Sequence, residues 1–425
     1  MHTHRDSVRG WRPGQAVIRA HRNEEVTGES IAGVLVCVPA CFNDQQRRAS
    51  LEVVEQATFR PLGTINEPSA AVIAVAKGKN GVYVIVDIGA GTTDVSVVRS
   101  EDDGHTITIL ATAGRDDRGG REVTSRIVEY CLDYASQHGV ALDPEEDSRD
   151  IVIIESEAET CKQDLSSRDS VTLTIRAKDK LLDIPLTLSA FNQLIADLCQ
   201  DILALVDEAL SQAQITPDEV DGVASVGGGS RVRYLRENIE VKFGSAKAMK
   251  DFDVDKCVVM GAVDAIAIKV QERIAVGDVA LQGMAPEYQL KGNVVLREVL
   301  GQALGVLAVN TRTMREQLAA MIPQGTALPA TASTTFGLIG GAEGVDSADI
   351  VVLQGKANCD PSDATELARF PLHDLPAGPT DERVRVELDV DTSALASVRA
   401  VDTFSGKEIQ GQAHTAAAVT KSHLG

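Results

Sequence analysis

The sequence feature that most constrains the fold is an apolar run that ends in an acid and a glycine-rich turn. Residues 82–86 read V-Y-V-I-V, the apolar, mostly β-branched pattern of a strand buried on both faces. Asp87 ends this run, and Gly89 and Gly91 then permit a tight turn in which backbone N–H groups can approach a ligand. The sequence therefore predicts a buried strand that delivers a carboxylate and a glycine turn to one edge of a sheet.

Polar side chains continue beyond these glycines. Thr92, Thr93 and Asp94 come next, and residues 95–98 read as the returning strand. An acid at a strand end beside a glycine turn suits a hydrated magnesium ion and a phosphate chain, because glycine amides donate to phosphate oxygens while the carboxylate holds the metal's water. The alternative is a glycine-rich hairpin with a solvated Asp87 at its edge, and these residues alone favour neither interpretation.

Composition argues against several classes of protein. With 425 residues the chain is long enough for roughly two or three domains. A net charge of −21 and an aromatic content of 3% argue against nucleic-acid binding and against a membrane-surface protein. No stretch approaches the roughly 18 consecutive apolar residues of a membrane span. The seven cysteines are scattered without C-x-x-C spacing, which is typical of reduced thiols in a cytoplasmic protein.

Two further glycine loops follow predicted strands. Residues 114–120 come after an alternating strand over 106–113, and residues 227–230 come after a strand over 220–226. Three such loops form the repeated phosphate grip of an α/β nucleotide fold. From about residue 300 to 410 the chain instead shows short alternating segments broken by Pro and Gly, which is the pattern of an antiparallel β-sandwich.

Five motifs in a fixed order resemble one family. They read V-C-V-P-A-C-F-N-D-Q-Q-R-R-A, I-N-E-P-S-A-A, V-D-I-G-A-G-T-T-D-V-S, A-T-A-G-x-x-x-x-G-G and V-G-G-G-S-R-V. The set closely resembles the DnaK family of 70-kDa heat-shock chaperones from about Gly33 to Val270, and more weakly from Val294 to Glu408. A lone D-x-G-x-x-T would also suit sugar kinases or actin relatives, so the ordered set carries the resemblance.

The resemblance implies an α/β fold, in which an actin-like (RNase H-like) ATPase domain with an incomplete first lobe precedes an antiparallel β-sandwich that binds peptides. The parts expected along the chain are an irregular N-terminal segment (1–30), a partial nucleotide-binding domain (31–275), a connector (276–300), the substrate-binding β-sandwich (301–411) and a flexible tail (412–425). The implied cofactors are ATP or ADP and Mg²⁺. The implied partners are unfolded or extended apolar polypeptide segments, a J-domain co-chaperone and a nucleotide-exchange factor, with no nucleic acid and no membrane.

Four residues resemble the family's catalytic groups. Asp87 looks like the carboxylate that positions the magnesium ion, through water, and the attacking water molecule. Glu67 resembles its partner on the side of the γ-phosphate. Thr92 would lie near that phosphate or the water, and Asp94 would line the same pocket.

A larger set resembles the family's nucleotide contacts. Its members are Gly89, Gly91, Gly119, Gly120, Glu159, Lys162, Gln163, Ser166, Gly227, Gly228, Arg231 and Asp255. Those from Glu159 to Ser166 are spaced i, i+3, i+4 and i+7 on one face of a predicted helix, where the family clasps adenosine; an ordinary exposed ion pair is the alternative for Glu159 and Lys162. Gln163 departs from the family, which usually has an arginine there to stack on adenine, and this departure predicts weaker nucleotide affinity.

Two further sets follow from the resemblance. Pro39 and Arg47 match a pair that relays the nucleotide state to the interdomain surface, although Pro39 could simply end a strand and the Arg47 stem could cover apolar surface. A peptide-binding site is implied for Met314, Phe336, Ala348 and Ile350, which could equally be core residues.

The chain also departs from the family at both ends. A first phosphate loop of the form G-I-D-x-G-T-T and an upstream lysine aimed at the γ-phosphate do not occur in the sequence, which predicts an N-terminally truncated ATPase domain with impaired hydrolysis. The leucine-rich linker reads V-V-L-R-E-V at residues 294–299, and the helical lid expected after the sandwich is missing.

The function expected from this resemblance is that of an ATP-dependent molecular chaperone, an ATP hydrolase by family resemblance, acting in the cytoplasm. One alternative is a non-hydrolysing adaptor (a pseudo-ATPase) that binds protein partners with the same surfaces. A sugar kinase of the same superfamily is disfavoured by the sandwich and by the I-N-E-P segment.

Overall fold

The predicted strand and its return form a β-hairpin in the middle of a sheet in the computed structural model. β3 (Gly81–Ile88) pairs antiparallel with β4 (Thr93–Glu101), with Asp87 opposite Asp94. β8 (Gly222–Val226) lies parallel to β3 on its other side, and β5 (Thr106–Arg115) pairs antiparallel with β4. Residues 83–88 are all buried, which confirms the prediction of a strand buried on both faces.

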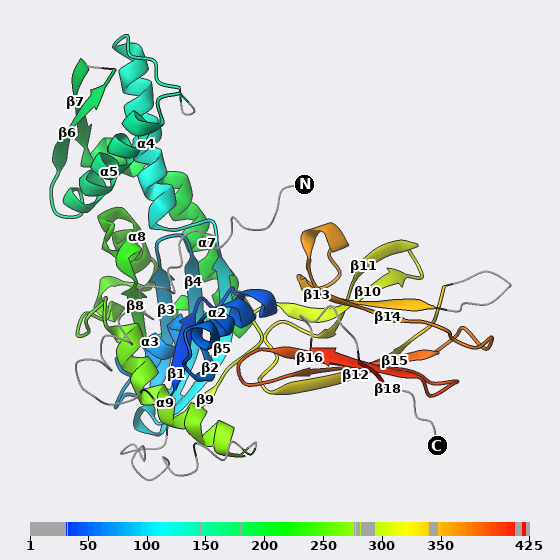
Figure 1. Cartoon of the computed structure of the whole chain (residues 1–425). Coiled ribbons are helices and arrows are strands. Elements are labelled where there is room, and N and C mark those ends of the chain that lie inside the picture. The colour runs from blue at the N-terminus through cyan, green and yellow to red at the C-terminus, as the bar shows by residue number, and fades with distance from the viewer. Residues whose placement is uncertain are drawn as a thin grey trace. The chain divides into compact units, whose positions relative to one another are not determined.

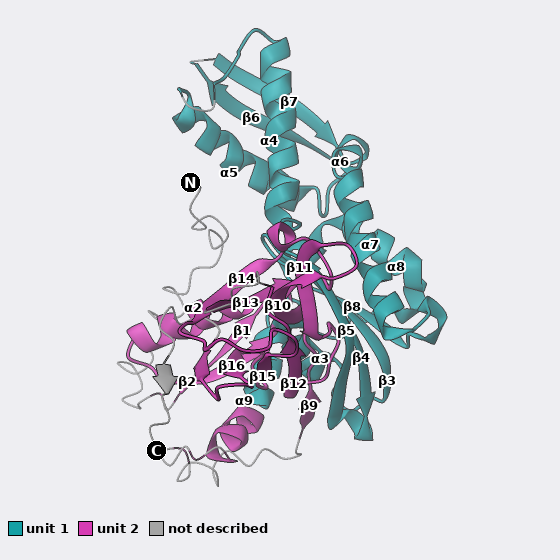
Figure 2. Ribbon diagram, turned by 90° about the vertical axis from the view of Figure 1, so that its right-hand side faces the viewer, with its two compact units in different colours: residues 1–12, 67–265 teal, residues 13–66, 266–425 magenta. Residues whose placement is uncertain are grey.

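The structure describes residues 31, 33–143, 146–178, 180–275, 277, 281, 294–339, 347–412 and 419–421. The predicted N-terminal segment 1–30, most of the predicted connector and most of the predicted tail lie outside the described residues. The chain divides into two compact units (Figure 2): unit 1 contains residues 67–265, and unit 2 contains the described residues of 13–66 and 266–425.

Unit 1 also contains helices that pack on this sheet or on one another. They are α3 (Glu67–Val75), α4 (Gly120–Gln137), α5 (Ser148–Asp164), α6 (Leu188–Leu194), α7 (Ala196–Ala213), α8 (Arg233–Phe243) and the first half of α9 (Cys257–Ala275). α7 packs on β4 and β5, and α3 packs on β3. Their buried side chains, such as Ile127 of α4 and Ile202 of α7, share one core with Val84, Val95 and Val97.

Unit 1 also contains an antiparallel hairpin, β6 (Ser170–Ala177) and β7 (Lys180–Thr187), which lies beside α4 and α5 (Figure 1). The amphipathic pattern over residues 189–213 predicts one long helix, but the structure has two helices, α6 and α7, that meet at Ile195. Its backbone leaves the helical region at ψ = 11°, and its side chain is fully buried. The apolar period continues across this break, so the sequence pattern does not reveal it.

Unit 2 contains a small parallel pair of strands, β1 (Val34–Val38) and β2 (Pro61–Asn66), joined by α2 (Asp44–Gln56). α2 begins with a capping box at Asn43: the Asn43 side chain accepts from the N–H of Gln46 at 3.0 Å, and the Gln46 side chain accepts from the N–H of Asn43 at 2.9 Å. Because Asn43 caps the helix, the carboxylate of Asp44 is available for contacts elsewhere.

The sandwich predicted in the C-terminal third is present in unit 2 as two facing antiparallel sheets (Figure 1). One has the strand order β11 (Arg315–Ile322), β10 (Ala303–Asn310), β13 (Ala348–Gly355) and β14 (Thr365–Leu372). The other has the order β12 (Ala330–Phe336), β15 (Val384–Val390), β16 (Ala396–Asp402), β17 (Glu408–Gln412) and β18 (Val419–Lys421). Val352 and Phe370 from the first sheet share a core with Leu388 and Val398 from the second.

A short strand, β9 (Val295–Arg297), precedes the sandwich within the stretch predicted as a connector. Among the described residues, no helix combines the length and the apolar character needed to cross a bilayer.

Candidate functional site

The turn between β3 and β4 is the first of three loops that converge in unit 1. The N–H of Gly89 donates to the Thr92 carbonyl at 2.8 Å, which closes the turn. A Cβ at Gly89 would lie 3.2 Å from the Thr92 hydroxyl oxygen, so glycine leaves that hydroxyl room beside the turn. Within the described residues, the N–H groups of Ala90 and Gly91 have no acceptor, and they are available to a ligand.

The loop that follows β8 packs directly on the end of β3. Because the two strands are parallel, both end at the same edge of the sheet. Gly227 has a φ of +77°, and a Cβ there would overlap Oδ1 of Asp87 and lie 2.6 Å from the Ile88 carbonyl oxygen. A glycine is therefore required at this position for the loop to approach the predicted catalytic acid.

The third loop joins β5 to α4 and is hydrogen-bonded to the first. The N–H of Gly120 donates to the Gly89 carbonyl at 3.0 Å, and the N–H of Arg121 donates to the Ala90 carbonyl at 2.6 Å. A Cβ at Gly119 would come within 2.9 Å of the Gly91 backbone. The three glycine loops predicted from the sequence thus form one assembly.

A cavity of about 640 Å³ opens over these loops. Its lining residues come from the three loops, from one face of α5 and from the turn that follows α5. They are Gly89, Ala90, Gly120, Arg121, Glu159, Lys162, Gln163, Ser166, Gly228, Gly229, Arg231 and Val232. The helical spacing that predicted one face for Glu159 to Ser166 therefore places all four residues on the same cavity wall.

Polar contacts organise the α5 side of the cavity. Lys162 pairs with Glu159 at 2.6 Å, and its ammonium group also donates to the Gly120 carbonyl and the Thr124 hydroxyl, each at 2.9 Å. Gln163 donates to the other carboxylate oxygen of Glu159 at 3.0 Å. Burial would raise the pKa of Glu159, but hydrogen bonds from Lys162, Gln163 and Thr124 outweigh it and hold the pKa below its usual value. Glu159 is therefore an ionised acceptor at the cavity wall.

Three acids gather at the end of the β3–β4 hairpin. Asp87 and Asp94 are buried, with 6% and 1% of their surfaces exposed, and Glu67 begins α3. Burial raises the pKa of Glu67 to about 8, and the charges of Asp87 and Asp94 add to this shift. Burial also raises the pKa of Asp87 to about 6. Desolvated carboxyl groups that repel one another favour a cation in their midst.

This donor set fits a magnesium ion that keeps its water ligands. Mg²⁺ prefers carboxylate and water oxygens and sheds its hydration shell reluctantly. Within the described chain, no group of three or more His, Cys, Asp and Glu side chains is arranged to hold a metal ion directly. Asp87, with Glu67 and Asp94 near it, would therefore hold the ion through water, which is the mode predicted for Asp87 from the sequence.

The structure brings together most of the predicted nucleotide contacts but leaves four outside the cavity lining. Gly91, Gly119 and Gly227 lie against Arg121, the Ala90–Gly91 backbone and the end of β3, respectively, and Asp255 pairs with Arg231 at 2.5 Å. Four lining residues were not predicted: Ala90, Arg121, Gly229 and Val232. The sequence contains a signal for two of these residues: Gly229 belongs to the same glycine run as Gly227 and Gly228, and Arg121 is a cation directly after a glycine loop.

Comparison with known proteins identifies the family. A sequence model of the family described as "Hsp70 protein" matches residues 17–424. The chain belongs to the Hsp70 family. The resemblance to 70-kDa heat-shock chaperones and the predicted combination of an ATPase-type α/β fold with a β-sandwich are thereby confirmed.

Relatives of this Hsp70-family chain include three proteins named "Chaperone protein HscA homolog". The one from Cupriavidus necator is 30% identical over 393 residues, which cover 91% of this chain and 58% of the relative. The one from Pseudoalteromonas atlantica is 31% identical over 409 residues, covering 95% and 60%. The one from Ralstonia nicotianae is 29% identical over 393 residues, covering 91% and 58%. The Hsp70-family chain thus spans about three fifths of the length of these relatives.

A second cavity of the Hsp70-family chain lies in the sandwich and measures about 490 Å³. Phe336, Ala348 and Ile350 line it, together with apolar residues of β10 such as Val306 and Leu307. Met314, the fourth residue predicted here, lies in the turn between β10 and β11, is 72% exposed and is not among the lining residues. Three of the four predicted residues therefore share one mostly apolar hollow.

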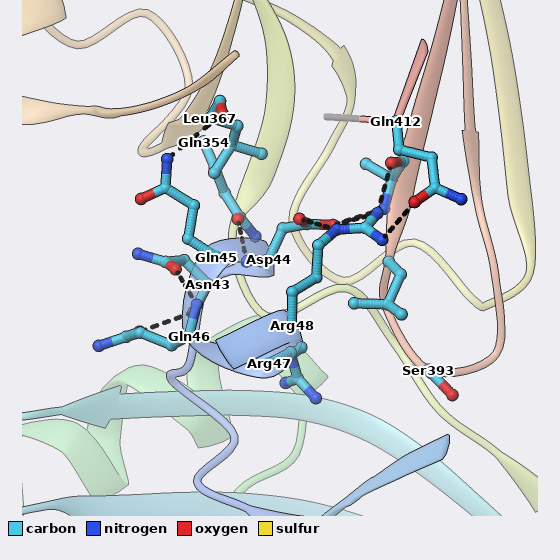
Figure 3. Close-up of polar contacts among 12 residues, drawn as sticks. Asn43, Asp44, Gln45, Gln46, Arg47, Arg48, Gln354, Leu367, Ser393 and Gln412 are labelled. Atoms are coloured by element: carbon cyan, nitrogen blue, oxygen red, sulfur yellow. Dashed lines mark hydrogen bonds and ion pairs between the residues drawn. The ribbon is translucent and has the colours of Figure 1, made fainter. Parts of the chain in front are cut away.

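The start of α2 is joined to the sandwich by hydrogen bonds (Figure 3). The N–H of Asp44 donates to the Gln354 side chain at 3.0 Å, and the Asp44 carboxylate accepts from the N–H of Ala396 at 2.6 Å. Arg48 pairs with Asp44 at 2.6 Å and donates to the Ala396 carbonyl at 2.8 Å. Asp44 thus connects the helix to both sheets of the sandwich, through its backbone N–H to β13 and through its buried carboxylate to β16.

The predicted relay residues lie next to this contact: Pro39 directly follows β1, and Arg47 is part of α2. Both are buried. Arg47 donates to the Asn66 side chain at 2.7 Å, at the end of β2, and to the Phe42 carbonyl at 3.1 Å. The Arg47 guanidinium therefore links the segment before α2 to the end of β2. The last residue of β2, Asn66, immediately precedes Glu67.

Proposed function

We propose that unit 1 binds ATP or ADP with Mg²⁺, and that the chain acts as an ATP-dependent chaperone of the Hsp70 type. The observation that carries this proposal is the convergence of three glycine loops on one cavity beside a cluster of three acids. A volume of about 640 Å³ lies within the range of small-molecule sites. Glycine loops and backbone amides at the ends of strands are the usual environment of a phosphate chain.

The residues then take distinct roles. The loops that contain Gly89, Gly119 and Gly120 would hold the phosphates, and the α5 face from Glu159 to Ser166 would hold the adenosine with Gly228 and Arg231. Asp87, Glu67, Thr92 and Asp94 would surround the γ-phosphate, where a carboxylate can orient and deprotonate an attacking water molecule. A magnesium ion held through water at Asp87 would neutralise charge on the phosphates.

We infer that the sandwich binds an extended apolar polypeptide segment. The hollow lined by Phe336, Ala348 and Ile350 is mostly apolar and is bordered by strand backbone. Such a surface recognises an extended chain by backbone hydrogen bonds and one or more side-chain pockets.

The contact between α2 and the sandwich supports a route by which the two activities could be coupled. Arg47 ties this segment to Asn66, which immediately precedes the candidate catalytic residue Glu67. We propose that Pro39 and Arg47 relay the nucleotide state along this path. We propose residues 31–275 as the nucleotide-binding domain and residues 301–411 as the substrate-binding domain, joined by the connector.

Further parts of the proposal concern surroundings and partners. A J-domain co-chaperone and a nucleotide-exchange factor would regulate turnover, as the family resemblance implies. All seven cysteines are free, which supports a reducing compartment such as the cytoplasm.

ATP turnover by the purified chain tests the proposed function, with Asp87→Asn as the control. We expect Mg-ATP to bind and to lower the affinity for a fluorescent extended apolar peptide, and phosphate release, where it occurs, to vanish in Asp87→Asn. Binding without turnover would favour the non-hydrolysing adaptor. A chain that binds neither nucleotide nor peptide would refute the proposal.

A further inference from the structure

We propose that Arg121 binds the phosphate chain of the nucleotide, as the cation that lies over the first glycine loop. This inference rests on the proposed function, because it concerns a residue of the same cavity. It assigns a role to a side chain that no motif of the sequence singled out.

The position of Arg121 places its guanidinium on the loop between β3 and β4. Arg121 is the second residue of α4, directly after Gly120, and its own N–H is bonded to the Ala90 carbonyl at 2.6 Å. A Cβ at Gly91 would overlap Nη2 of Arg121 and lie 2.8 Å from Cζ and 3.0 Å from Nε. The guanidinium therefore rests against bare glycine backbone, at a distance that only a glycine permits.

The charges of the cavity single out the same residue. Three cationic side chains line it: Arg121, Lys162 and Arg231. Lys162 is paired with Glu159 at 2.6 Å, and Arg231 is paired with Asp255 at 2.5 Å. Within the described residues, the Arg121 side chain has neither a hydrogen bond nor an ion pair, so its charge is not neutralised by a neighbour.

The backbone of α4 cannot supply this positive charge through its first two amides. Those of Gly120 and Arg121 already donate to the carbonyls of Gly89 and Ala90. A guanidinium, by contrast, offers planar paired donors that match two oxygens of one phosphate. The site therefore combines an unpaired guanidinium, the adjacent N–H groups of Ala90 and Gly91, and the glycine surface beneath. This combination can bind a di- or triphosphate, but it offers no charge interaction to an uncharged nucleoside.

This difference between phosphate and nucleoside provides the experiment. Binding of Mg-ADP and of adenosine is measured by calorimetry for the full chain and for Arg121→Gln, Arg121→Lys and Arg126→Gln. Arg126 lies on the same helix, pairs with Asp197 and Glu129, and is not among the cavity-lining residues, so it serves as a matched control.

We expect Arg121→Gln to weaken ADP binding by about tenfold or more, the usual effect of losing a charged hydrogen bond, with adenosine affinity unchanged. Arg121→Lys should recover part of the loss, and Arg126→Gln should bind both ligands like the parent chain. An ADP affinity within twofold of the parent in Arg121→Gln would overturn the inference. So would an equal loss of adenosine affinity, because the residue would then support the cavity and not the phosphates. If the parent chain binds adenosine but Arg121→Gln does not alter ADP affinity, the inference fails while the proposed function stands; if the parent binds neither ligand, both fail.

Discussion

The acid cluster makes a quantitative prediction about Glu67. Replacing Glu67 by Gln keeps the shape of the protonated side chain but removes the ionisable group. In the native state burial and the charges of Asp87 and Asp94 raise the pKa of Glu67 from 4.5 to about 8. The folded chain therefore holds a proton that the unfolded chain releases, and stability falls as the pH rises from about 4.5 towards 8.

The size of this effect follows from the two pKa values. At pH 7 the solution is about 2.5 pH units above the pKa of the unfolded side chain, so that side chain is ionised, while the folded one is still mostly protonated. This difference costs about 3 kcal/mol of stability. At pH 5 the same cost is below about 1 kcal/mol. Glu67→Gln removes the cost, so the variant should exceed the parent chain in unfolding free energy by about 3 kcal/mol at pH 7 and by little at pH 5.

The assay is hydrogen exchange measured as a function of urea concentration, because the exchange of peptides from β3 and β4 reports the unfolding of unit 1. The experiment is run without nucleotide and with EDTA, so that no bound cation restores the ionised form of the acids. Glu157→Gln, on the exposed side of α5, is the matched control and should leave these peptides unchanged. Equal stabilities of Glu67→Gln and the parent chain at pH 7, or a parent stability that does not change between pH 5 and pH 8, would refute the reasoning.

Two further predictions concern the cavity and the sandwich. Gln163→Arg should tighten Mg-ADP binding about threefold or more, because a guanidinium at the cavity wall can stack on adenine. The control Gln137→Arg, at the end of α4, should leave the affinity unchanged. Calorimetry measures both affinities, and an unchanged affinity of Gln163→Arg would contradict the prediction. Arg383→Met should lower the stability of the sandwich by about 3–5 kcal/mol, because it leaves the fully buried Asp402 without its partner at 2.9 Å. Arg385→Met, which breaks an exposed pair, should cost less than about 1 kcal/mol in the same urea unfolding experiment, and similar costs for both variants would contradict the account.

Local sequence signals were enough to predict the centre of unit 1. The apolar run before Asp87, the glycine loops and the helical spacing from Glu159 to Ser166 each depend on a few adjacent residues, and all are present as expected. The sandwich was also predictable in kind from its alternating segments. Some of its strands do not alternate in exposure: residues 303–306 of β10, for instance, are buried in succession.

Other features depend on contacts between residues far apart in the sequence. The Asp44 carboxylate, at the start of α2, accepts from the N–H of Ala396, which is 352 residues away. The helix breaks at Ile195, whose side chain is fully buried, although the apolar period continues across it. Arg121 follows a predicted loop, yet its location over Gly91 becomes visible only when β3, β4 and α4 are assembled.

The most direct measurement of the central claim is hydrogen–deuterium exchange of the full chain with and without Mg-ADP. The account predicts slower exchange in four separate segments on addition of the nucleotide: residues 89–92, 119–121, 159–166 and 227–232, which contain the three glycine loops and the α5 wall. Exchange that does not change in these segments at saturating Mg-ADP, or protection confined to other parts of the chain, would contradict the assignment of the cavity as a nucleotide site.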